Sequence, residues 1–94
     1  MTPGKARTDI FEIRSSQKFQ TQSYYKYQIL NIGTNDLLIG VNGRNLQNLS
    51  TGDEFIIEVD YRLIINDNID LQFTGAGTNI AQIVAVKVEE YPVY

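Results

Sequence analysis

Short apolar runs separated by turn-forming residues constrain the fold of this chain more than any other sequence feature. From Ser23 onward the runs are rich in isoleucine, valine, leucine and aromatic residues. They recur at the roughly 8–12-residue spacing that is typical of sandwiches and small barrels. No segment keeps a helical apolar period over a window of about 11 residues. We therefore predict an all-β fold, a small antiparallel β-sandwich or barrel-like domain of about six to seven strands.

Alternation and turn chemistry locate the expected strands. The dipeptide Asn42-Gly43 tolerates positive φ at both positions and predicts a tight turn. Residues 44–49 are polar apart from two leucines, and we expect a connector there. The order of the strands does not follow from these patterns. The expected strands cover residues 23–32, 37–41, 54–59, 62–65, 69–73 and 80–88. The expected core contains Ile29, Leu38, Phe55, Ile57, Ile69, Leu71, Phe73, Val84 and Val86.

The first 22 residues differ from the rest of the chain in charge. Four basic residues oppose two acidic ones there, a net charge of +2, whereas the remaining 72 residues hold four basic and nine acidic residues, a net charge of −5. We therefore divide the chain into an extended N-terminal arm, residues 1–22, and a β-sandwich domain, residues 23–94. An acidic body with a basic arm that buries little of its own surface suggests that the arm reaches a neighbouring subunit.

The arm contains an alternating segment, residues 9–14, that fits an edge strand added to a neighbouring sheet. Its apolar side chains would contact the partner, and its basic side chains would pair with acidic groups. Two alternatives stay open: the segment pairs with its own domain as a first strand, or it is a frayed terminus. The candidate partner-binding residues are Arg7, Ile10, Phe11, Ile13, Arg14, Lys18 and Tyr24.

Missing residue types exclude several classes of chemistry. The chain has no Cys and no His, so disulfides, thiolate metal sites, cysteine nucleophiles and the commonest general base are all absent. We therefore expect no enzyme and no cofactor. Carboxylates at positions 53, 54, 58 and 60 leave one alternative, catalysis by an acid–base pair. Positions 54 and 58, however, share a strand face of the kind that is usually solvated.

Two further motifs favour turns over ligand sites. Residues 66–70 crowd oxygen ligands together, but an EF-type calcium loop needs a glycine and an acid where this chain has Leu71 and Gly77. A calcium site of another type, shared with residues 53–54, is the alternative. The loop at 75–77 lacks the third glycine and the helix of a phosphate cradle, so we expect a hairpin loop there.

Neither a nucleic acid nor a membrane is an expected partner. The cluster of Tyr24, Tyr25 and Tyr27 contains a single basic residue, Lys26, too few for a surface that binds single strands. No run approaches the ~20 apolar residues that cross a bilayer. The basic residues near the N-terminus are followed by no apolar segment, so we expect no secretory signal.

Residues 21–90 resemble a known group of proteins in their arrangement of strands and turns. A strand leads into N-I-G-T-N-D, a short apolar strand ends at an N-G turn, L-S-T-G-D-E-F begins the next strand, and F-T-G-A-G-T-N precedes the last one. This pattern is similar to that of small β-sandwich virion structural proteins of tailed bacteriophages. The resemblance implies a capsid decoration, head-fibre or connector protein, assembled in the host cytoplasm and located in the virion. Its implied partners are other virion proteins, with a homo-oligomer or a larger assembly as the quaternary state, and it implies no site residues.

Two functions of other classes remain open. A carbohydrate-binding or adhesin module would use the tyrosines at 24, 25 and 27 as stacking platforms, although the absence of Trp counts against it. A domain of a bacterial cell surface would need an export signal.

Overall fold

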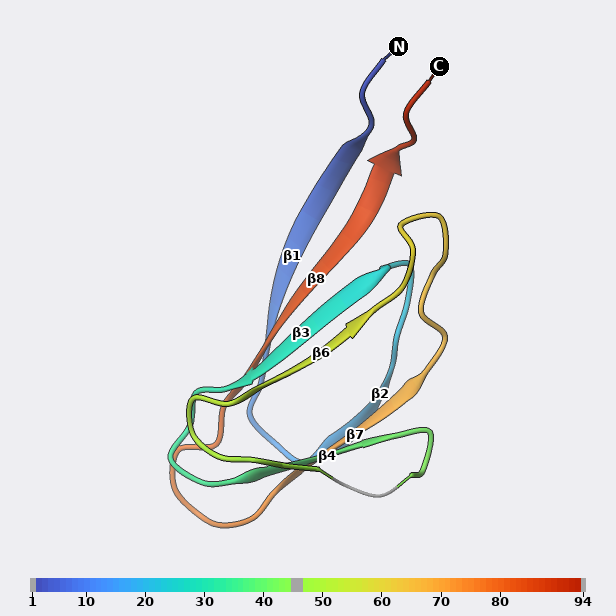
Figure 1. Ribbon diagram of the computed structural model, residues 1–94. Coiled ribbons are helices and arrows are strands. Elements are labelled where there is room, and N and C mark those ends of the chain that lie inside the picture. The colour runs from blue at the N-terminus through green and yellow to red at the C-terminus, as the bar shows by residue number, and fades with distance from the viewer. Residues whose placement is uncertain (1, 45–46, 94) are drawn as a thin grey trace.

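The computed structural model describes residues 2–44 and 47–93. It is all-β: two antiparallel sheets of four strands each, with no helix among the described residues (Figure 1). Nothing in those two ranges therefore forms a helix that could span a membrane. The strands are β1 (Lys5–Ile13), β2 (Gln17–Gln20), β3 (Lys26–Asn31), β4 (Leu37–Val41), β5 (Gln47–Leu49), β6 (Glu54–Glu58), β7 (Asn68–Phe73) and β8 (Ala81–Glu90).

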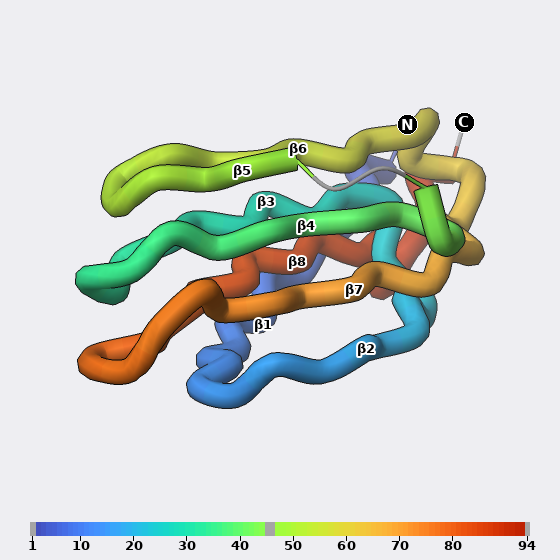
Figure 2. Tube along the Cα trace, turned by 90° about the horizontal axis from the view of Figure 1, so that it is seen from below, coloured from blue at the N-terminus to red at the C-terminus, as the bar shows by residue number. Residues whose placement is uncertain are grey.

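The two sheets stack as the layers of a small sandwich (Figure 2). One sheet has the strand order β1-β8-β3-β6 and the other β2-β7-β4-β5. Every connection except the one between β4 and β5 therefore passes from one sheet to the other. The predicted antiparallel all-β fold is confirmed, with eight strands in place of six or seven.

The hydrophobic core lies between the two sheets. Alternate residues of β3 and β8 face alternate residues of β4 and β7, as expected for strands with one face toward a core. Of the predicted core, Ile29, Ile69 and Leu71 are buried, and Phe55, Ile57 and Phe73 are partly buried against them. The buried hydrophobic residues are Tyr24, Tyr27, Ile29, Leu37, Ile39, Leu49, Ile65, Ile69, Leu71, Ala81, Ile83 and Ala85.

The core prediction is wrong for Leu38, Val84 and Val86, which are only half-buried. Their strands are apolar on both faces, so alternation alone does not choose the inner one. For β8 the choice comes from its register with β3, where Ile83 lies opposite the buried Ile29. Since directly opposite residues share a face of the sheet, the odd-numbered residues of β8 face inward and its valines face outward.

The Asn42-Gly43 turn is confirmed. Asn42 has φ 53° and Gly43 has φ 74°, and the Arg44 N–H donates to the Val41 carbonyl over 3.1 Å. The turn leads into β5, which pairs with β4 from Leu37↔Leu49 to Ile39↔Gln47. The segment expected to be a plain connector thus contains an edge strand.

The N-terminal segment is not confirmed as an extended arm. β1 pairs with β8 from Lys5↔Glu90 to Ile13↔Ala81, and β2 pairs with β7. The physical reason is that β8 would otherwise end its sheet as a long unpaired edge, for which β1 supplies hydrogen-bond partners. The structure agrees with the alternative that was left open, in which this segment is the first strand of the chain's own domain.

The charges of this segment also meet partners in the same chain. Arg7 lies 2.9 Å from Glu89 on β8, and Lys5 lies 3.8 Å from Glu90. Part of the charge difference between the two parts of the chain is therefore matched within one molecule, across two neighbouring strands.

Residues 62–65 do not form the expected strand. The Asp60 carboxylate accepts hydrogen bonds from the Arg62 guanidinium and from the Arg62 backbone N–H, each with a contact of 2.9 Å. The Leu63 N–H donates to the Asp60 carbonyl over 2.8 Å. These local bonds close a turn that competes with strand pairing. The guanidinium hydrogen bonds, followed by the backbone one, lower the pKa of Asp60 to about 2.

The glycine loop at 74–79 is not a hairpin loop, because β7 and β8 belong to different sheets. It packs closely against the end of β3, where a Cβ added to Gly33 would lie 2.8 Å from the Ile80 nitrogen. The Asn35 amide fixes the loop from the other side by donating to the Ala76 carbonyl over 2.8 Å. A residue without a side chain is therefore required at position 33.

Candidate protein-binding edge

One side of the sandwich presents two unpaired strand edges. β1 is the end strand of one sheet and β2 the end strand of the other. β2 runs along the lower side of the molecule in Figure 2, below the labelled part of β1. Each has a single strand neighbour among the described residues, so one row of its backbone N–H and C=O groups has no strand partner. Such an edge is a template for pairing with another chain.

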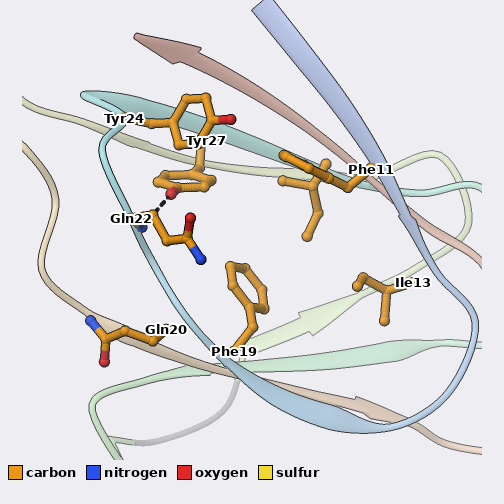
Figure 3. Close-up of a pocket in the computed structure, with 8 residues that line it drawn as sticks. Phe11, Ile13, Phe19, Gln20, Gln22, Tyr24 and Tyr27 are labelled. Carbon is orange, nitrogen blue, oxygen red and sulfur yellow. Dashed lines mark hydrogen bonds between the residues drawn. The ribbon is translucent and has the colours of Figure 1, made fainter.

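An apolar cavity of about 220 Å³ opens between these two edges. β1 contributes Phe11 and Ile13, β2 contributes Phe19, and β3 and β8 form its inner wall (Figure 3). The lining residues are Phe11, Ile13, Phe19, Gln20, Gln22, Tyr24, Tyr27 and Ile83.

The aromatic rings of this cavity support one another. The Tyr24 and Tyr27 rings lie 5.4 Å apart at 67°, and the Phe11 and Tyr24 rings lie 6.2 Å apart at 85°. Phe19 lies 6.3 Å from Tyr27. Edge-to-face contacts of this kind add stability beyond burial alone, so the wall is preorganised.

Both tyrosine hydroxyls are already hydrogen-bonded. The Tyr27 hydroxyl accepts from the Gln22 N–H over 2.8 Å, as the dashed line in Figure 3 marks. The Tyr24 hydroxyl donates to the Asp9 carboxylate over 2.5 Å. The rings therefore present their carbon surface to the cavity, and an occupant would meet an apolar wall.

A small polar network closes the β1 side of the site. The hydrogen bond from Tyr24 is the main cause of an Asp9 pKa below its ordinary value, and the Arg7 charge lowers it further. The same hydrogen bond, followed by burial, raises the pKa of Tyr24. Lys87 lies over the Tyr24 ring at 5.5 Å from the centroid. This network fixes β1 to the body beside the cavity.

The structure brings together three of the seven candidate partner-binding residues. Phe11, Ile13 and Tyr24 line the cavity, and Arg7 reaches the site through Asp9. The other three lie elsewhere. Ile10 is on the outer face of its sheet, Arg14 pairs with Glu12 in the β1–β2 connection, and Lys18 faces away on β2.

Two apolar cavity residues, Phe19 and Ile83, were not among the candidate residues, and Tyr27 was named only as a platform for sugar stacking. The alternation of polar and apolar residues in Gln17–Gln20 is a weak signal for a strand with Phe19 facing inward. No pattern in the sequence indicates that β2 is the end strand of one sheet while β1 is the end strand of the other, because strand order is set by the tertiary structure.

The carboxylates considered for catalysis are engaged separately. Asp53 accepts from the Ser50 N–H over 3.0 Å, Glu54 accepts from Gln28, and Glu58 pairs with Lys26 at 3.5 Å. In the part of the chain that the structure describes, they form no acid–base pair with one another.

The asparagine-rich turn at 66–70 likewise joins two loops. The Asn42 amide donates to the Asp67 carboxylate over 2.8 Å, and the Asn42 carbonyl accepts from the Asn68 N–H over 2.8 Å. Within residues 2–44 and 47–93, no three acidic side chains gather as a metal site would require.

Comparison with protein-family models, with curated proteins and with solved structures finds no match to this chain. The open edge and its aromatic cavity therefore carry the functional argument.

Proposed function

We propose that this chain is a non-enzymatic structural component of a tailed-phage virion, a capsid auxiliary, decoration or connector protein. In this role it holds neighbouring protein chains at the open edge of its sandwich. The observation that carries the proposal is the apolar cavity flanked by the free edges of β1 and β2. The virion setting rests on the resemblance of residues 21–90 to small virion proteins.

The geometry suits an extended protein segment. Backbone groups of such a segment would pair with the free edge of β1 or β2, and an apolar side chain would enter the cavity, as in strand addition generally. The cavity of about 220 Å³ is larger than the roughly 150 Å³ apolar cavity that accepts benzene. It can therefore take one large aliphatic or aromatic side chain.

A carbohydrate-binding module is the second candidate, and the exposure of the tyrosines disfavours it. Tyr24 is 8% exposed and Tyr27 is 3% exposed, and both hydroxyls are engaged within the chain. Among the three clustered tyrosines only Tyr25 keeps a half-exposed ring. A single tyrosine is a poor stacking platform for a sugar.

Immunoelectron microscopy tests the virion role. Particles purified from a culture of the phage that encodes this chain should bind an antibody against it. Phe11→Lys places a charge at the cavity mouth and should abolish this labelling, while circular dichroism shows a folded chain. Ile56→Lys is the matched control, because Ile56 is 48% exposed against 43% for Phe11 and lies on the far edge strand. Unlabelled wild-type particles, or equal loss in both variants, would contradict the proposal.

A further inference from the structure

We propose that β1 is exchanged between two copies of this chain, so that the β1 strand of each copy pairs with β8 of the other. The inference builds on the proposed function by naming a second copy as the first neighbour. In the exchanged pair, Phe11 and Ile13 of the second copy line the cavity of the first.

Everything that β1 contacts lies on the far side of one short connection. Its backbone pairs with β8, Phe11 packs on Tyr24, and Asp9 accepts from the Tyr24 hydroxyl. Each of these partners follows the β1–β2 connection in the chain. A β1 strand from another copy would make the same contacts, so exchange loses none of them.

The connection is only three residues long, Arg14 to Ser16, and it reverses the chain between the two sheets. The Ser16 hydroxyl accepts from the Phe73 N–H over 2.9 Å, which anchors its far end to the body. Short hinges of this kind favour domain swapping, because straightening the hinge sends the strand into a neighbour.

β1 is also easy to release and costly to leave absent. None of its nine residues is buried, and its ion pairs are solvent-exposed. Without β1, however, β8 would present a ten-residue edge, and Tyr24 and Ile83 would lose their cover. The body therefore needs a β1 strand, and the strand of a second copy satisfies the same requirement.

The ion pairs between β1 and β8 would form equally well in an exchanged pair. β1 carries Lys5 and Arg7, and the part of β8 beyond β3 carries Glu89 and Glu90. Acidic and basic members of these pairs lie on different strands, so two copies would form two identical sets. This reciprocity is what a closed two-fold dimer requires.

Cysteine cross-linking tests the exchange directly, because the chain has no cysteine of its own. Thr8 lies opposite Val86 in the β1–β8 register, and both face outward. Opposite residues lie about 4.5–5.5 Å apart, within the roughly 4.4–6.8 Å that a disulfide spans. Copies with Thr8→Cys and copies with Val86→Cys are unfolded together, refolded and oxidised. Exchange gives a covalent heterodimer on a non-reducing gel.

Glu58→Cys replaces Val86→Cys in the control mixture. Position 58 lies in the same cross-strand row but on β6, three strands from β1, so it should give only background cross-linking. The wild-type native mass should be twice the 10.7 kDa of one chain. Insertion of a flexible Gly-Ser segment after Ser15 should return it to one chain by letting β1 fold back freely.

No heterodimer above the Glu58→Cys control, together with a one-chain native mass, would overturn the exchange. Particle labelling in that case would leave the virion role intact. An exchanged dimer absent from particles would instead overturn the virion role alone.

Discussion

The buried side chain of Asn31 joins the two sheets at one end of the sandwich. Its amide donates to the carbonyls of Leu49 and Asn35, both over 2.8 Å, and its carbonyl accepts from the Gly33 N–H over 3.1 Å. Asn31 is fully buried, yet its polar side-chain atoms are all partnered. A polar residue at this position therefore stabilises the fold through three backbone partners.

Replacing Asn31 by Ala should lower the free energy of unfolding by at least about 2 kcal/mol, because buried backbone groups lose their partners. Urea denaturation measures the change. Asn48→Ala is the matched control, since the Asn48 amide is exposed and donates to the Asp36 carboxylate over 3.2 Å; it should change stability by no more than about 0.5 kcal/mol. Equal losses in the two variants would contradict this role for Asn31.

Asp9 should make stability depend on pH in the acid range. The Tyr24 hydroxyl and the Arg7 charge hold its pKa below 3.8 in the folded chain. A lowered folded pKa means that its contribution is complete above the ordinary value and is lost as the pH falls through the lowered one. The stability difference between wild type and Asp9→Asn should therefore be larger at about pH 6 than at about pH 2.5.

Urea midpoints at the two pH values measure this difference. Tyr24→Phe keeps the ring but removes the donor, so the acid sensitivity should weaken there as well. A difference between wild type and Asp9→Asn that is the same at both pH values would show that the Asp9 contact adds nothing to folding.

At the scale of elements, β8 is the strand around which its sheet is organised. It pairs with β1 on one side and with β3 on the other. Its inner face carries Ala81, Ile83 and Ala85. An apolar run on both faces suits a strand that is paired along both edges and partly covered on its outer face.

Deleting residues 1–14 should remove the cooperative thermal transition of the chain. The deletion leaves the long edge of β8 unpaired and exposes the cavity wall, and small domains have little stability to spare. Circular dichroism during heating measures the transition. Ile10→Thr is the control, because Ile10 is 61% exposed on the outer face and its change should stay within about 0.5 kcal/mol. A truncated chain that melts like the wild type would mean that β1 is dispensable.

The whole molecule is elongated, with extents of 51 × 23 × 17 Å. The pairing of β8 with β3 ends at Val86, whereas its pairing with β1 continues to Glu90. A two-stranded ribbon of β1 and β8 therefore projects past the sandwich (Figure 1). Thr2 and Val93 bridge its tip through two backbone hydrogen bonds of 2.6 and 2.9 Å. Both ends of the described chain therefore lie side by side at one end of the molecule.

No bound metal should contribute to the stability of this molecule. The carboxylates of the turn at 66–70 already accept hydrogen bonds from amide groups, Asp67 from Asn42 over 2.8 Å and Asp70 from Gln72 over 3.2 Å, and hydrogen bonding of this kind stabilises turns without an ion. Differential scanning calorimetry should give the same melting temperature with calcium and with chelator. A rise of several degrees on adding calcium would identify a site that the turn geometry does not reveal.

The sequence by itself determined the features that depend on neighbouring residues. Period-two alternation located β6 and β7, and the positive-φ pair Asn42-Gly43 located the end of β4, because side-chain direction and turn conformation are local properties. Phe11 and Ile13 could be predicted as candidate contacts because they are apolar residues within the polar N-terminal segment, residues 1–22. Tyr24 could be predicted because it follows that segment closely in the sequence.

Only the tertiary structure decided which strands meet. Local patterns favoured Val84 and Val86 for the core, but pairing with β3 turned Ile83 and Ala85 inward. The same local patterns suggested a free N-terminal arm, but β1 pairs with the edge of β8 that would otherwise be unpaired. The cavity also depends on which strands pair. Phe19 and Ile83 line one cavity because β1 is the end strand of one sheet and β2 is the end strand of the other. Alternation fixes the two faces of a strand, whereas the partner strand selects the buried one.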